Sequence, residues 1–91
     1  MIVTLEKTKE WLRVESTDDD ALIESFILAA EEIVQGVLRF PFEELETVPE
    51  EIKKAVWYTV SKLYELRESF DVEALLNTLK HLLYEFRKDA W

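Results

Sequence analysis

The sequence predicts an all-α fold, a compact bundle of about four helices with a long second helix at its centre. Three observations carry this prediction. The 91 residues include one glycine and two prolines, which leaves little material for tight turns and favours long helices with few connections. Apolar side chains recur with helical spacing, and capping residues precede the apolar runs. At this length we expect a single domain over residues 1–91.

The first helix is expected over residues 5–13, with Thr4 as its N-cap. The threonine hydroxyl can accept a hydrogen bond from a backbone N–H of the first turn, which otherwise has no partner. Its apolar side is short, so this helix depends on packing against the rest of the chain.

Three consecutive aspartates, residues 18–20, stand where the second helix begins, with Thr17 or Asp18 as the expected N-cap. Negative charge in a first turn complements the positive end of the helix dipole. A calcium loop would need spaced oxygen ligands and a glycine, in the pattern D-x-D-x-D-G, whereas here Ala21 follows contiguous acids. The cluster therefore predicts a helix start. Pro41 ends this second helix.

The second helix carries apolar residues over about half of its circumference, more than an ordinary surface helix needs. Two adjacent stripes make up this surface: Leu22, Phe26, Ile33 and Val37, and beside them Ile23, Ile27, Ala30 and Val34. We expect four of these to be largely buried, namely Ile23, Phe26, Ala30 and Ile33. Leu28 is expected to point outward among Glu24, Glu31, Glu32 and Gln35. The helix is either flanked by several neighbours or also meets another subunit, and the sequence leaves both open.

The third helix is expected to begin near Pro49 and run to about Glu68, with Thr47 and Glu50 at capping-box spacing. Its inner face would hold Ile52, Ala55, Val56, Thr59, Leu63 and Leu66, and one edge Trp57, Val60 and Tyr64. The fourth helix is expected from Asp71, where Phe70 and Leu75 have hydrophobic-staple spacing. Its stripe would be Val72, Leu75, Leu76, Leu79, Leu82, Leu83 and Phe86. Phe40 and Phe42, in the loop between the second and third helices, are expected to fold back onto the core.

Residues that could carry out chemistry are scarce. There is no cysteine, and the single histidine, His81, is expected on the solvent side of the fourth helix. Gly36 lies inside a helix, so no glycine-rich loop can bind phosphate. Glu31 and Glu32 lack the Glu-x-x-His repeats of helical carboxylate metal sites and are expected on the surface. We therefore expect no enzyme activity, no cofactor and no metal, and no apolar run approaches the roughly 20 residues of a membrane span.

Beyond these patterns, the ordered segments resemble a known family. The stretch "MIVTLEKTKEWLRVESTDDDALIESFILAAEEIV" resembles the N-terminal half of the head–tail connector (adaptor) proteins of long-tailed bacteriophages and prophages, often labelled DNA-packaging proteins. Segments at residues 48–56, 64–68 and 71–76 are similar to the later parts of these proteins, in the same order. Each segment is an ordinary amphipathic helix, and it is the ordered set that is specific.

The resemblance implies an all-α ring former. About a dozen copies would sit beneath the portal protein, extend the DNA channel and receive the next neck or tail-completion protein. DNA would be a passing, non-specific cargo, which fits the net charge of −9 because an acidic wall repels phosphate. The implied location is the virion neck, after synthesis in the bacterial host cytoplasm, with no membrane partner. The alternative is an acidic DNA mimic that inhibits a DNA-binding protein as a monomer or dimer.

We hypothesise that subunits associate through Leu28 on the second helix and through the Trp57 and Tyr64 edge of the third. One small four-helix core does not need both a half-circumference apolar surface and an aromatic edge, and surplus apolar surface usually marks a contact site. Ring closure also requires two different surfaces that meet head to tail.

Overall fold

The computed structural model describes residues 1–65 and 71–86, and its regular elements there are all helical. Four α-helices follow one another: α1 (Leu5–Leu12), α2 (Asp20–Leu38), α3 (Glu50–Glu65) and α4 (Val72–Leu82). Single 3-10 turns, η1 (Phe42–Glu44) and η2 (Tyr84–Phe86), follow α2 and α4. The predicted all-α class is confirmed. The expected end of the third helix near Glu68, the inner residue Leu66 and the staple residue Phe70 lie outside the described residues.

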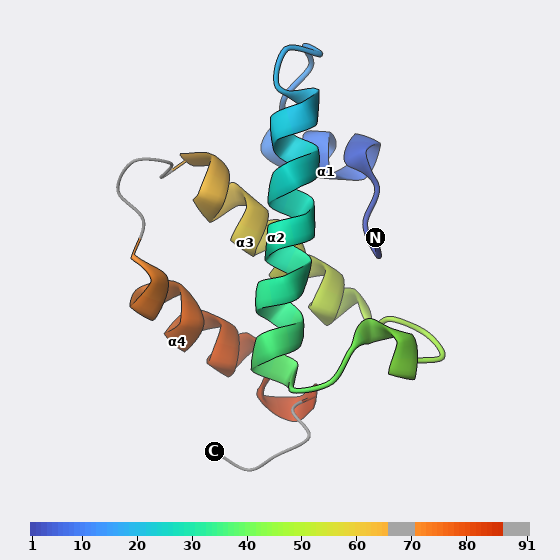
Figure 1. Cartoon of the computed structure of the whole chain (residues 1–91), viewed down its shortest axis with the longest axis vertical. Coiled ribbons are helices and arrows are strands. Elements are labelled where there is room, and N and C mark those ends of the chain that lie inside the picture. Colours follow the sequence, from blue (N-terminus) through green and yellow to red (C-terminus); the bar gives the residue numbers. More distant parts are fainter. Residues whose placement is uncertain (66–70, 87–91) are drawn as a thin grey trace.

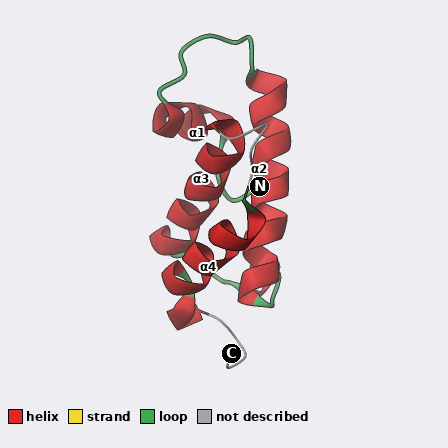
Figure 2. Ribbon diagram, turned by 90° about the vertical axis from the view of Figure 1, so that its left-hand side faces the viewer, coloured by secondary structure: helices red, strands yellow, loops and turns green. Residues whose placement is uncertain are grey.

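The helices form two layers. Figure 2 shows α2 alone on one side of the molecule and α1, α3 and α4 together on the other. In Figure 1, α2 runs through the centre of the molecule, and it contacts each of the other three helices. The result is a thin plate, with principal extents of 41 × 31 × 16 Å. The prediction of a central second helix is confirmed.

The core lies between these two layers. One stripe of α2, formed by Ile23, Ile27, Ala30 and Val34, has no exposed surface. It belongs to one apolar cluster with residues of α3 and α4: Ile52, Ala55, Val56, Val60, Leu75, Leu79 and Leu83. The expectation of burial holds fully for Ile23 and Ala30, whereas Phe26 and Ile33 are only half-buried. A single opposing layer cannot cover the full apolar arc of α2, so the flanks of the arc lie at the rim of the core.

Helix boundaries follow the predicted capping residues in two of four cases. Thr4 caps α1, since its Oγ1 accepts a hydrogen bond from Lys7 N at 3.1 Å. Asp71 caps α4, since its Oδ1 accepts from Ala74 N at 3.0 Å. Both caps use hydrogen bonds within four residues along the chain, which is why spacing alone predicts them.

The other two helix starts differ from the prediction. The N-cap of α2 is Asp19 rather than Thr17 or Asp18, and its side chain makes no capping hydrogen bond. α3 begins at Glu50, and the Pro49 carbonyl accepts hydrogen bonds from the N–H groups of Ile52 and Lys53. A proline disfavours helical backbone in the residue before it, here Val48. α3 therefore does not begin early enough for Thr47 to cap it.

The stripe predicted for the fourth helix is only partly buried. Leu75, Leu79 and Leu83 are buried, but Val72 and Leu82 are 51% and 49% exposed. α4 lies at the edge of the plate, where α2 and α3 cover only one side of it (Figure 1). His81 is exposed, as the sequence predicts.

The segment after α2 folds back onto the core as expected. Phe42 is buried, and Phe40 is half-buried against the same cluster. Gln35 fixes this return: its Oε1 accepts a hydrogen bond from Phe42 N at 2.9 Å, while its Nε2 donates to the Glu31 carbonyl at 3.0 Å. One side chain thus connects the last turns of α2 to the loop that follows.

Glu31 was expected on the surface, and that expectation is wrong. Glu31 is only 7% exposed, and Oε2 of its side chain accepts a hydrogen bond from Ile2 N at 2.7 Å. The bond spans 29 residues and ties the segment before α1 to the middle of α2. A buried carboxylate is tolerated here because it receives a backbone donor.

Gly36 offers a direct test of this description of α2. It lies inside the helix, is exposed, and a Cβ added there would meet no atom within 4 Å. Gly36→Ala should therefore raise the free energy of unfolding by about 0.5–1 kcal/mol, because alanine loses less backbone entropy on folding. The melting temperature should rise by about 2–8 °C. An unchanged or lower melting temperature would contradict the open, helical environment of this residue.

Candidate functional site

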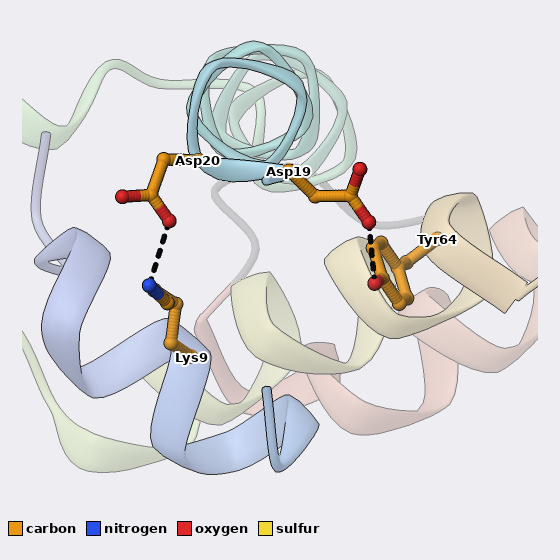
Figure 3. A network of polar contacts seen from close by, with 4 residues as sticks. All are labelled: Lys9, Asp19, Asp20 and Tyr64. Atoms are coloured by element: carbon orange, nitrogen blue, oxygen red, sulfur yellow. Dashed lines mark hydrogen bonds and ion pairs between the residues drawn. The ribbon is translucent and has the colours of Figure 1, made fainter. Parts of the chain in front are cut away.

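The aspartate cluster is the first candidate for a site. Within residues 1–65 and 71–86, no three His, Asp or Glu side chains are grouped so as to hold a metal ion. The polar atoms of Asp19 and Asp20 are instead used inside the domain (Figure 3). Asp19 Oδ2 accepts a hydrogen bond from the Tyr64 hydroxyl at 2.9 Å. Asp20 Oδ1 lies 2.7 Å from Lys9 Nζ in an ion pair.

These two contacts join three helices at one point. Lys9 belongs to α1, Asp20 opens α2, and Tyr64 lies in the last turn of α3. The Asp20 and Lys9 side chains are 32% and 15% exposed, so the ion pair is partly withdrawn from water and is screened less than a surface pair. We call this set of four residues, Lys9, Asp19, Asp20 and Tyr64, the aspartate clasp. Asp18 is not part of the clasp and is exposed.

Leu28, the first predicted contact residue, is on the outer surface of α2 and is 58% exposed. Its exposed neighbours on this surface are Ala21, Glu24, Ser25, Glu32 and Gly36. We call these six residues the α2 face. It points away from the layer of α1, α3 and α4, so its apolar centre is covered by no described part of the same chain.

Trp57 and Tyr64, the other two predicted contact residues, are half-buried and have partners within the domain. Trp57 Nε1 donates a hydrogen bond to Thr8 Oγ1 at 3.1 Å. The Trp57 indole also stacks on that of Trp11, with 5.4 Å between ring centroids and 20° between planes. The structure therefore places Trp57 and Tyr64 at the junctions of α3 with α1 and α2, apart from Leu28.

An exposed apolar surface that the sequence did not predict lies on the layer formed by α1, α3 and α4. Trp11 and Leu82 are 46% and 49% exposed, and with Tyr58 they line one open cavity of about 250 Å³. The remaining lining residues are Glu51, Lys54 and Ala55, and we call the cavity the Trp11 groove. No helical pattern could have revealed it, because its walls come from α1, α3 and α4, which meet only in the folded chain.

The hydrogen bond between Tyr64 and Asp19 in the clasp should contribute measurably to the stability of the domain. Tyr64→Phe removes only the hydroxyl that donates to Asp19, and should lower the free energy of unfolding by about 1–2 kcal/mol because the acceptor is charged and partly buried. Tyr58→Phe is a matched control, since the Tyr58 hydroxyl makes no hydrogen bond with any residue of the described chain. Thermal unfolding of both variants tests this. Equal melting temperatures would mean that the hydrogen bond between Tyr64 and Asp19 contributes nothing to stability.

Comparison with models of protein families gives a match over almost the whole chain. The model of a family described as phage gp6-like head-tail connector proteins matches residues 2–90. A search of curated proteins found no match, and neither did a search of solved structures. No helix among the described residues is long and apolar enough to cross a membrane. Because the family model covers nearly every residue, the chain belongs to the phage gp6-like head–tail connector family.

Proposed function

We propose that this chain is a structural subunit of a ring at the portal vertex of a phage or prophage particle, where it extends the DNA channel and joins head to tail. The observation that carries the proposal is the family match over residues 2–90. About a dozen copies would form the closed ring, in which every copy uses the same pair of surfaces. The role requires neither catalysis nor a cofactor.

The partners follow from this position. The portal protein would contact one rim of the ring, and the next neck or tail-completion protein the other. Subunits would be made in the cytoplasm of the bacterial host and end in the virion neck. DNA would pass through without being held, and the net charge of −9 supports this, because an acidic wall repels the phosphate backbone at long range.

Contacts between subunits would involve Leu28 on one side and the aromatic edge of α3, with Trp57 and Tyr64, on the other. Leu28 is exposed and surrounded by polar residues, as expected of an apolar contact point. Trp57 is stacked on Trp11, so this edge would meet a neighbour largely through the exposed indole of Trp11. Each contact can be weak in free solution, since a small subunit loses much translational and rotational freedom on association, and the portal would serve as a template.

The substitution Leu28→Glu tests the proposal. Leu28 is exposed and lies outside the core, so the substitution should change the free energy of unfolding by no more than about 0.5 kcal/mol. Ring formation on the portal protein of the same genome should be lost, because a charge would replace the apolar contact. Electron microscopy of the mixture measures this.

Val72→Glu is the matched control, because Val72 is similarly exposed but lies on α4, away from the α2 face. It should assemble normally. Normal assembly of Leu28→Glu would remove Leu28 from the interface. If the unaltered chain binds no portal and stays a monomer or dimer at all concentrations, the ring proposal itself is wrong.

A further inference from the structure

Two exposed apolar surfaces belong to the two different layers of a thin plate. The α2 face carries Leu28 at its centre, and the Trp11 groove is lined only by residues of the other layer. The two layers are seen edge-on in Figure 2. The plate is only 16 Å thick, and because the two surfaces belong to different layers, one copy can present them to two neighbours at once.

The size of the groove indicates what it can accept. Its volume of about 250 Å³ is below the roughly 300–1,000 Å³ of typical small-molecule sites. Its walls are the Trp11 indole, the Tyr58 ring and the Leu82 side chain, so an aliphatic group would find apolar contact on several sides. These dimensions suit one protruding side chain such as leucine.

The charges around the two surfaces are complementary. Leu28 has an exposed glutamate one turn away on either side, Glu24 and Glu32. The groove carries Lys54, which has no carboxylate partner within residues 1–65 and 71–86. Lys62 lies beside it, with Nζ 5.4 Å from the centroid of the Tyr58 ring. Two lysines, Lys54 in the lining and Lys62 over the Tyr58 ring, therefore lie at or beside the groove, whereas Glu51 is the single acid in the lining.

We propose that Leu28 of one copy enters the Trp11 groove of the next copy, with Glu24 and Glu32 directed toward Lys54 and Lys62. The occupant is thus a second copy of this chain, and the contact is heterologous, as a closed ring requires. This inference rests on the proposed function, and it replaces the Trp57 and Tyr64 edge by the Trp11 groove as the surface that receives Leu28. The broad face of the plate, 41 × 31 Å, is large enough to supply the roughly 800 Å² per partner of a standard interface.

The groove is already formed before a neighbour arrives. Trp11 is held by its stack on Trp57, and Trp57 is itself fixed by the hydrogen bond to Thr8. Thr8 is fully buried, and its hydroxyl donates to the Thr4 carbonyl at 2.7 Å. The Trp11 side chain therefore has little conformational freedom left to lose on binding, which favours association. Trp57 thereby serves the interface as the support of Trp11.

Disulfide trapping tests the contact directly, because the chain has no cysteine of its own. Three samples are oxidised: Leu28→Cys alone, Leu82→Cys alone, and an equal mixture. A disulfide needs Cα atoms about 4.4–6.8 Å apart, so covalent dimer should form in the mixture and only at background level in either variant alone. A mixture of Leu28→Cys with Val72→Cys sets the background, since Val72 is as exposed as Leu82 but does not line the groove.

A second experiment uses the fact that a head-to-tail contact joins two different surfaces, one from each copy. Leu28→Glu retains the groove and Leu82→Glu retains the leucine, so neither variant should form rings on the portal protein alone. Mixed with each other at high concentration, where a weak contact is populated, they should form a one-to-one heterodimer and stop there, because only one intact contact is available. Melting temperatures near that of the unaltered chain establish that both variants fold.

Two outcomes would overturn the inference. Trapping of Leu28→Cys with itself would indicate a symmetric contact between two α2 faces. Rings of the unaltered chain on the portal, without trapping above background in the mixture, would place the contact elsewhere while leaving the proposed function standing. A failure of the unaltered chain to assemble on the portal would instead refute the proposed function.

Discussion

The burial of one stripe of α2 is the interaction on which the rest of this structure depends. Ile23, Ile27, Ala30 and Val34 are completely buried, and α2 is the helix that contacts α1, α3 and α4 alike. A domain of 91 residues buries a limited share of its surface, and no disulfide is available to compensate. Each remaining helix is therefore stable mainly because it packs against α2, or against α3, which itself lies on α2.

Polar side chains along α2 then fix what the apolar stripe only brings together. Near the start of the helix, Asp19 and Asp20 hold Tyr64 and Lys9; in the middle, Glu31 holds the backbone of Ile2. Apolar burial is non-directional, whereas these contacts have defined geometry and so select one arrangement of α1 and α3 over α2. Asp19, Asp20 and Glu31 thus hold other elements in place, whereas the remaining acids among the described residues are exposed to solvent.

The sequence predicts those features whose partners are near in the chain. Thr4 and Asp71 cap their helices through residues three positions away, and the width of the α2 stripe reveals its central place. Glu31 was misjudged because its partner is 29 residues distant, and the N-cap of α2 because the Asp19 carboxylate binds Tyr64, 45 residues away. The Trp11 groove exists only where three helices meet. The exposure of Leu82, which lies on the predicted apolar stripe of α4, can be seen only once the helices that cover α4 are known.

Ala55 illustrates what a plate of two layers implies for sequence change. It is completely buried in the core, yet it also lines the Trp11 groove. A thicker domain can vary its interior independently of its surface, but here a larger residue at this position would both disturb the packing on α2 and fill the groove from below. Under the proposed assembly, interior and surface positions should change together as such chains diverge, and some substitutions that the isolated domain tolerates would not be tolerated in the ring.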